Sequence, residues 1–276
     1  MARTSRAFDG GYPPRRRRGC GCAALGASVL VIILTLTVIM WLASMYDGLL
    51  TTTNRQPIPR DIPPAAAQQP PAIDTEAPGR TANQLGEWSL PIADQLGVEP
   101  QAIRAYANAE LIAARAWPEC NLKWNTLAGI GWVETRHGTY TGKLFDAGRL
   151  NDDGVADPPI IGVRLDGSPG FAKIHDTDGG QFDGDKEFDR AIGPMQFLPE
   201  SWKHYGRDGN GDGVADPQQI DDAALAAATV MCSGGRDMAT EQDWRAAILG
   251  YNHSNDYLAK VRDAAANYAL GQPAQR

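Results

Sequence analysis

The sequence predicts a mainly α-helical domain of the α+β class that follows one N-terminal transmembrane helix. Two observations support this prediction: a long uncharged segment lies near the N-terminus, and alanine- and leucine-rich segments with helix-capping residues occur through the rest of the chain. The chain has 276 residues, of which 43% are hydrophobic, and this content can fill a sizeable core. The composition therefore excludes a wholly disordered, collagen-like or coiled-coil protein.

The first element is an uncharged segment of 24 residues, 23–46. A helix needs about 20 apolar residues to cross the hydrocarbon core of a bilayer. Arg15–Arg18 precede the segment, and Trp41 and Tyr46 lie near its far end, as interfacial aromatic residues do. A cleaved signal peptide is the alternative, but its apolar region is shorter, about 7–15 residues. We therefore expect residues 1–22 in the cytoplasm and a single-pass protein of the cell membrane with an extracytoplasmic C-terminal domain.

Residues 47–80 form the next element and are predicted to be a linker. Seven prolines lie between positions 51 and 80, and proline at this density prevents helix and sheet alike. Such a segment favours an extended, semi-rigid backbone, so it would hold the following domain away from the membrane. The domain itself is expected over residues 81–276.

Helical signals dominate the domain. Proline suits the first turn of a helix, acidic residues suit its N-terminus, and glycine suits the position after its end. On these signals we expect helices over Glu99–Ala116, Leu122–Glu134, Pro199–Tyr205, Asp221–Cys232, Thr240–Leu249 and Asn255–Leu270. Thr240 and Ser254 are the expected N-caps of the last two helices. Residues 139–190 form a polar, acidic insertion, in which Ile160–Leu165 is the best strand candidate.

Charge is divided unevenly along the chain. The formal net charge is −7, yet the first 19 residues hold six arginines and one acid, whereas the remainder holds 20 basic and 32 acidic residues. An acidic domain is repelled by phosphate backbones, so nucleic acid is not expected among its partners.

The four cysteines fit the expected topology. Cys20 and Cys22 lie at the cytoplasmic face, where reduced thiols or palmitoylation are expected. Cys120 and Cys232 lie in the exported domain, where oxidation is favoured. A disulfide between them would close a loop of 111 intervening residues, which corresponds to about 4–5 kcal/mol in the chain-entropy model. Two unpaired buried thiols are the alternative.

Glu134 is the first candidate for chemistry. It follows Leu127, Ile130 and Gly131 at helical spacing, so it shares a helix face with apolar residues. Partial desolvation raises the pKa of a carboxyl group and suits it to donate a proton near neutral pH. The alternative is a glutamate at a helix end that is exposed to solvent or paired with Arg136.

Two later segments carry candidate substrate-binding residues. Gln196 lies in a tight Gly-Pro turn, where its amide can orient a sugar hydroxyl or satisfy backbone groups of its own loop. Tyr251, Asn252 and Tyr257 combine aromatic faces with an amide, as carbohydrate sites do, because sugar rings pack on aromatic rings and present hydroxyls at their edges. A junction between two helices is the alternative for these three residues.

Together these segments resemble the lytic murein transglycosylases of the soluble-B type. The resemblance rests on GIGWVETRHG around Glu134, AIGPMQFLPESW around Gln196 and YNHSNDY farther on, and it covers about residues 99–270. It implies a lysozyme-like domain in which Glu134 is the lone catalytic acid/base. It also implies that Gln196 contacts the substrate and that Asn252 and Tyr257 line the cleft.

The number of carboxylates decides the expected mechanism. An ordinary glycosidase uses two carboxyl groups, but one suffices when the N-acetyl carbonyl of the substrate attacks the anomeric carbon. No second acid lies at a motif position. Asp146 and Asp189 are the candidates for a second catalytic carboxylate, but neither belongs to a motif. The resemblance implies cleavage of the MurNAc-β-1,4-GlcNAc bond of peptidoglycan with formation of 1,6-anhydro-MurNAc. A hydrolytic muramidase and a non-catalytic, calcium-stabilised module that binds the cell wall are the alternatives.

Residues 208–219 resemble a calcium loop of the EF-hand type. The expected oxygen ligands stand at positions 1, 3, 5, 7 and 9 of this loop, and they are Asp208, Asn210, Asp212, the Val214 carbonyl and Asp216. Position 12 is Gln219 in place of the usual glutamate, with Asp221 or Asp222 as substitutes. A solvated turn without metal is the alternative. We expect a structural Ca²⁺ and no organic cofactor.

Overall fold

The computed structural model describes residues 36–40, 55–140 and 148–275. The chain forms two compact units, Met1–Arg55 and Gln56–Arg276. In the first unit residues 36–40 are helical, and the rest of the expected membrane helix, like the cytoplasmic tail, lies outside the described residues. None of the helices described is long and apolar enough to cross a membrane.

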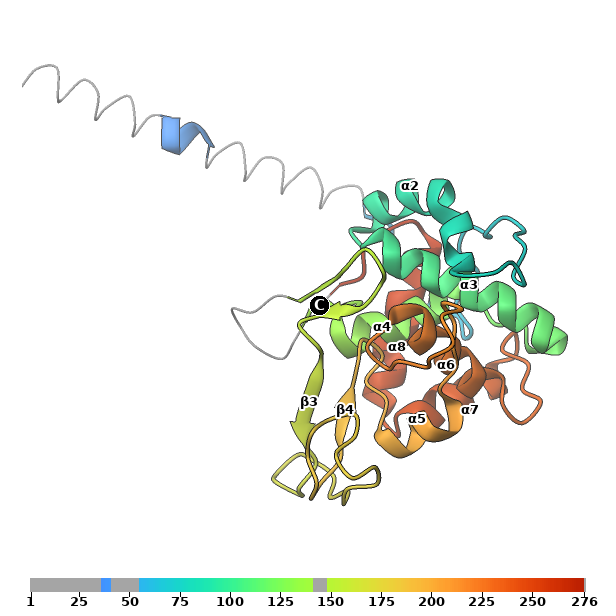
Figure 1. Ribbon diagram of the computed structural model, residues 1–276. Helices are drawn as coiled ribbons and strands as arrows, with labels where there is room; N and C mark the ends of the chain where they lie inside the picture. Colours follow the sequence, from blue (N-terminus) through green and yellow to red (C-terminus); the bar gives the residue numbers. More distant parts are fainter. Residues whose placement is uncertain (1–35, 41–54, 141–147, 276) are drawn as a thin grey trace, which may run out of the picture. The chain divides into compact units, whose positions relative to one another are not determined.

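The second unit is mainly α-helical, as the sequence predicts (Figure 1). Its 3-10 helices are η1 (Thr81–Leu85) and η2 (Pro118–Cys120), and its α-helices are α2 (Gly86–Leu96), α3 (Pro100–Ala116), α4 (Trp124–Thr135), α5 (Pro199–Tyr205), α6 (Ile220–Cys232), α7 (Glu241–Tyr251) and α8 (Asn255–Ala269). All six helices expected from the sequence are present, with small differences at their ends. Thr240 and Ser254 are the N-caps, since their side chains accept hydrogen bonds from the backbone N–H groups of Asp243 and Tyr257. The sequence did not predict α2, because Pro91 lies inside it and proline disfavours a helix interior.

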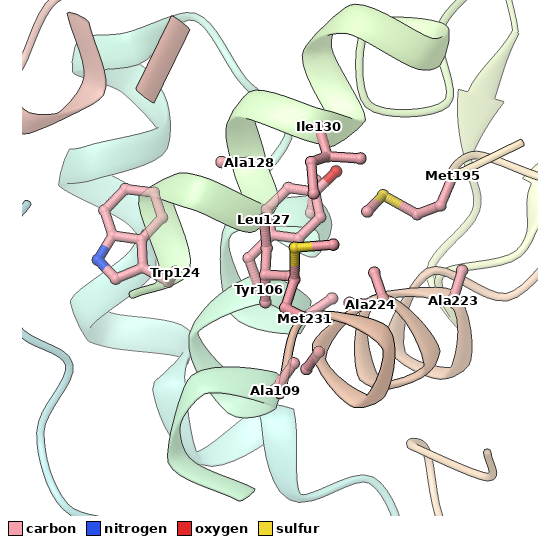
Figure 2. Close-up of a cluster of buried hydrophobic side chains, with 14 of the residues drawn as sticks. Tyr106, Ala109, Trp124, Leu127, Ala128, Ile130, Met195, Ala223, Ala224 and Met231 are labelled. Carbon is pink, nitrogen blue, oxygen red and sulfur yellow. The ribbon is translucent and has the colours of Figure 1, made fainter. Parts of the chain in front are cut away.

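The core is built around α3, which packs against α2, α4 and α6, while α4 packs against α8. Figure 2 shows part of this core, with Tyr106 of α3 and Met195 close to the apolar side chains of α4. Two glycines allow α4 to lie this close to its neighbours. A Cβ atom at Gly129 would meet the Val261 carbonyl of α8 at 2.7 Å, and one at Gly131 would meet the Tyr106 hydroxyl at 2.0 Å.

The acidic insertion forms two small antiparallel sheets. Strand β1 (Arg149–Leu150) pairs with β2 (Ala156–Asp157), and β3 (Ile161–Arg164) pairs with β4 (Arg190–Ile192). Strand β3 confirms the strand expected over Ile160–Leu165. Strand β4 leads directly into the turn that carries Gln196, so the insertion ends next to this candidate substrate-binding residue.

The structure corrects the expectation of a free linker over residues 47–80. The described part of this segment has neither helix nor strand, as predicted, but from Gln56 onwards it belongs to the second unit. Its apolar side chains, including Ile62 and Ile73, pack against the core, and the Gln68 carbonyl accepts a hydrogen bond from Trp124 Nε1 at 2.9 Å. Proline prevents regular structure but leaves the side chains free to be buried, so this segment is an outer layer of the domain.

Cys120 and Cys232 form the expected disulfide, with a Cα–Cα distance of 5.4 Å. It joins the end of η2 to the end of α6, and both cysteines are buried. The bond therefore holds together two helix ends that are far apart in the sequence.

Candidate active site

Glu134 lies in the last turn of α4, where the helix ends. Arg136 and His137 both adopt left-handed backbone conformations, with φ values of 54° and 61°, and this turn carries the chain away from the helix axis. The Glu134 side chain is half-buried, and Oε1 accepts a hydrogen bond of 2.6 Å from the Tyr257 hydroxyl of α8. The carboxyl group is thus held by one neutral donor in an environment shielded from solvent.

This environment changes the pKa of Glu134. Burial raises the pKa to about 7, and the hydrogen bond from Tyr257 opposes the rise in part. Neither of these two causes is a second carboxylate. Glu134 is therefore protonated in a substantial fraction of molecules near neutral pH, which a general acid requires.

A tight turn lies against the end of α4. Ile192 and Phe197 exchange two backbone hydrogen bonds of 2.8 and 3.0 Å, and these close the turn that contains Gln196. The Thr135 hydroxyl, next to Glu134 in sequence, donates to the Pro194 carbonyl at 2.6 Å. The turn is therefore fixed to the same helix end that carries the glutamate.

The third segment completes the cluster from the other side. The Tyr251 hydroxyl donates to the Met195 carbonyl at 2.7 Å, and its ring lies nearly parallel to that of Tyr257, with centroids 6.4 Å apart. Burial raises the pKa of both tyrosines, and the nearby Glu134 carboxyl adds to this rise, so both stay neutral hydrogen-bond donors. The structure thus connects Tyr257 to Glu134 by a hydrogen bond and Tyr251 to Tyr257 by ring stacking.

Gln196 and Asn252 lie at the edge of this cluster. Gln196 has a left-handed backbone with φ of 50°, and its Nε2 donates to the Gly193 carbonyl at 3.0 Å, while Gln196 and Tyr251 line one pocket. Asn252 is exposed at the end of α7, and its backbone N–H donates to the Ile248 carbonyl. The Gln196 side-chain N–H group therefore stabilises its own turn, which is the alternative considered from the sequence, while its Oε1 lies against Gly162 of β3.

Sequence reasoning missed a buried polar network behind Glu134. His137 is fully buried, and its Nδ1 and Nε2 lie 3.1 and 2.8 Å from the hydroxyls of Tyr106 and Tyr268. Burial and the nearby Arg136 charge lower the pKa of His137 to about 3, so the ring is neutral. The network fixes the turn that follows Glu134, and the histidine of the ETRHG segment was its signal in the sequence.

The loop expected to bind calcium is closed by its own hydrogen bonds. Asp208 accepts from the backbone N–H groups of residues 211, 212 and 213, and Asn210 and Asp212 accept from N–H groups two residues ahead. Gln219, at position 12, is buried and caps α6 with its Oε1. Asp222 faces the loop in its place and accepts from the N–H groups of residues 209, 210 and 216.

In the part of the chain that the structure describes, the carboxylates that converge to within 4.8 Å of one another belong to Asp176, Asp178 and Asp189, in the acidic insertion. Asp189 is buried and accepts hydrogen bonds from the backbone N–H and the hydroxyl of Thr177, at 2.9 and 2.8 Å. Asp189, a second acid considered from the sequence, thus serves to fold the insertion, and Asp146 lies outside the described residues.

Comparisons with known proteins bear on these residues. Residues 188–248 match the model of a family described as the transglycosylase SLT domain, and this range includes Gln196. A comparison with curated protein sequences finds no match. Among solved structures, the chain is similar to the Escherichia coli lytic transglycosylase Slt35, both in complex with bulgecin A and in complex with calcium.

The Slt35 complex with bulgecin A has 16% identity and a TM-score of 0.37, over 71% of this chain and 81% of that chain. The complex with calcium has 16% identity and a TM-score of 0.38 over the same shares, 71% and 81%. The family match over residues 188–248 confirms the enzyme class expected from the sequence, a lytic transglycosylase.

Proposed function

We propose that this enzyme is a peptidoglycan lytic transglycosylase that cleaves the MurNAc-β-1,4-GlcNAc bond and forms 1,6-anhydro-MurNAc, with Glu134 as its only acid/base. The observation that carries the proposal is the half-buried Glu134 carboxyl, whose pKa is about 7 and which the Tyr257 hydroxyl holds at 2.6 Å. Both forms of such a group are populated near neutral pH, so the same side chain can donate and later accept a proton.

In the first step the protonated Glu134 transfers its proton to the glycosidic oxygen. The C1–O bond of the muramyl residue breaks, and the carbonyl oxygen of its own N-acetyl group bonds to C1 in place of a protein nucleophile. Tyr257 donates to one oxygen of the glutamate, which orients the carboxyl group and stabilises the carboxylate that this step leaves.

In the second step the Glu134 carboxylate accepts the proton of the muramyl 6-hydroxyl. The oxygen of that hydroxyl attacks C1, the bond from the N-acetyl oxygen to C1 breaks, and the 1,6-anhydro ring closes. Glu134 returns to its protonated form, and water takes no part in the reaction. Tyr251 supports the turn of residues 192–197, which is fixed to the end of α4 that carries Glu134.

Product analysis tests this function. We expect the full-length protein to release soluble fragments from peptidoglycan sacculi, and mass spectrometry is expected to find them lighter by one water molecule than hydrolysis products. Fragments with hydrated reducing ends would instead identify a muramidase. Binding to sacculi without any release would identify a non-catalytic cell-wall-binding module.

The proposed location follows from the same substrate. A single helix over residues 23–46 would anchor the chain in the cell membrane, with residues 1–22 in the cytoplasm and the enzyme domain facing the cell wall. The oxidised Cys120–Cys232 pair is consistent with a domain that folds outside the cytoplasm.

We also propose that Ca²⁺ binds the loop from Asp208 to Asp216 and acts there as a structural ion. The donors would be Asp208, Asn210, Asp212, the Val214 carbonyl and Asp216. Asp222 is the further carboxylate of the proposal, since it faces the loop and accepts from the N–H groups of residues 209, 210 and 216. Burial raises the pKa of Asp222 to about 7, and the nearby Asp208 charge adds to the rise. A cation would offset this repulsion and favour the ionised form of Asp222.

Calcium is therefore expected to raise the melting temperature of the protein. Differential scanning calorimetry of the full-length protein, first in buffer depleted of Ca²⁺ and then with Ca²⁺ in excess, measures the shift. Asp208→Asn removes one charge of the proposed donor set and is expected to abolish the shift, whereas Asp94→Asn, at an exposed position of α2, is expected to keep it. An equal melting temperature with and without Ca²⁺ would refute the site.

A further inference from the structure

A pocket of about 190 Å³ adjoins the candidate active site. Gln196 and Tyr251, which belong to that site, form part of its wall, and apolar side chains, including Phe197 and Val230, line it further. Ser201 and Arg236 add polar groups. A volume of this size holds about six water molecules, which is enough for a short aliphatic chain that ends in a polar group.

Arg236 gives this pocket a positive charge. Its Nη1 donates to the Val230 carbonyl and to the Ser233 hydroxyl, both at 2.9 Å, so the guanidinium is held at the end of α6. Within the described parts of the chain, no carboxylate forms an ion pair with Arg236. The adjacent acid, Asp237, instead accepts a hydrogen bond from Asn121 at 2.9 Å.

A fixed guanidinium with N–H donors to spare is suited to a carboxylate, which it can bind with two parallel hydrogen bonds. A short series of side-chain contacts also links the pocket to the catalytic group. Tyr251 lines the pocket and stacks on Tyr257, and the Tyr257 hydroxyl lies 2.6 Å from Glu134. Two stacked tyrosine rings thus lie in this series between the pocket and Glu134, a separation that a peptide stem of several residues on a bound glycan strand can span.

We propose that this pocket binds the acidic peptide stem of peptidoglycan, with Arg236 pairing with a stem carboxylate and the apolar wall contacting the aliphatic part. This inference rests on the proposed function, because the glycan strands named there carry such stems on their lactyl groups. The site makes the enzyme prefer strands with stems over strands from which the stems have been removed.

Two substrates test the proposal with the full-length protein: intact sacculi, and the same glycan strands after an amidase has removed the stems. The measured quantity is the ratio of kcat/KM for strands with stems to kcat/KM for strands without them. Arg236→Gln is expected to lower this ratio about tenfold, through KM, because a charge-assisted hydrogen bond is lost. Arg236→Lys, which keeps the charge, is expected to restore part of the ratio.

Arg245→Gln is the matched control, since Arg245 lies on α7, where its guanidinium pairs with Glu241, and is not in the pocket. It is expected to keep the ratio of the wild type. The proposal is overturned if Arg236→Gln leaves the ratio unchanged, or if the wild type cleaves both substrates equally well.

Binding separates this proposal from the proposed function. Isothermal titration calorimetry with the free tetrapeptide of the stem, which carries no sugar and no bond for the enzyme to cleave, measures the pocket apart from the glycan-binding site. We expect the wild type to bind it about tenfold more tightly than Arg236→Gln does. If no fragments are released but this difference is found, the proposed function fails and the pocket stands; if fragments are released without a difference, the pocket assignment fails.

Discussion

Replacing Glu134 by glutamine is expected to reduce the release of soluble fragments from peptidoglycan by about a thousandfold. Glutamine has the size of glutamate, and its carbonyl oxygen can still accept the hydrogen bond from Tyr257, so the site should keep its shape. The amide has no acidic proton to give to the glycosidic oxygen and accepts none from the 6-hydroxyl. Release of dye from labelled sacculi measures the loss.

Glu87→Gln is the control for this substitution. Glu87 is an exposed residue in the first turn of α2, and the same chemical change there is expected to leave the rate of release unchanged. Circular dichroism and thermal melting establish that both variants fold. Retention of more than about a tenth of the wild-type rate by Glu134→Gln would contradict the role of this residue as the acid.

Removing the disulfide with Cys120→Ser and Cys232→Ser is expected to lower the free energy of unfolding by about 4–5 kcal/mol. The bond joins positions 112 apart in the sequence, so its loss frees a long loop in the unfolded chain. It also releases the segment after α6, where the Met238 N–H donates to the Cys120 carbonyl at 2.7 Å. Urea denaturation followed by tryptophan fluorescence measures the change.

Cys20→Ser combined with Cys22→Ser provides the comparison, since both cysteines lie outside the second unit. This variant is expected to unfold at the same urea concentration as the wild type. The contribution of the disulfide would be refuted if the variant lacking Cys120 and Cys232 also kept the wild-type midpoint.

Local signals explain why the sequence predicted the helices well. Thr240 and Ser254 each cap a helix with their own side chain, and Pro199 begins α5, so the information lies within a few residues of each helix end. Helix α2 was missed because Pro91 gives a contrary local signal, which packing of the helix against α3 overrides. The burial of the proline-rich segment was missed because it depends on contacts with distant parts of the chain.

For the candidate site, too, the sequence indicated single residues but not the contacts between them. The sequence indicated Glu134, Tyr251 and Tyr257 individually, but only the folded chain brings the Tyr257 hydroxyl, 123 positions away, to the glutamate. The His137 network depends likewise on Tyr106 and Tyr268, which have no motif of their own. In each case the missing information was tertiary contact between residues far apart in the sequence.

The pKa of Glu134 is the measurement that tests the central claim most directly. Carbon-13 NMR of the full-length protein with labelled glutamate follows the carboxyl signal with pH, and the spectrum of Glu134→Gln identifies it. The pKa is expected at about 7, because burial raises it, and the rate of cleavage should then fall as the pH rises above this value. A pKa near 4.5, the ordinary value for glutamate, would leave Glu134 ionised at neutral pH and would contradict its role as the proton donor.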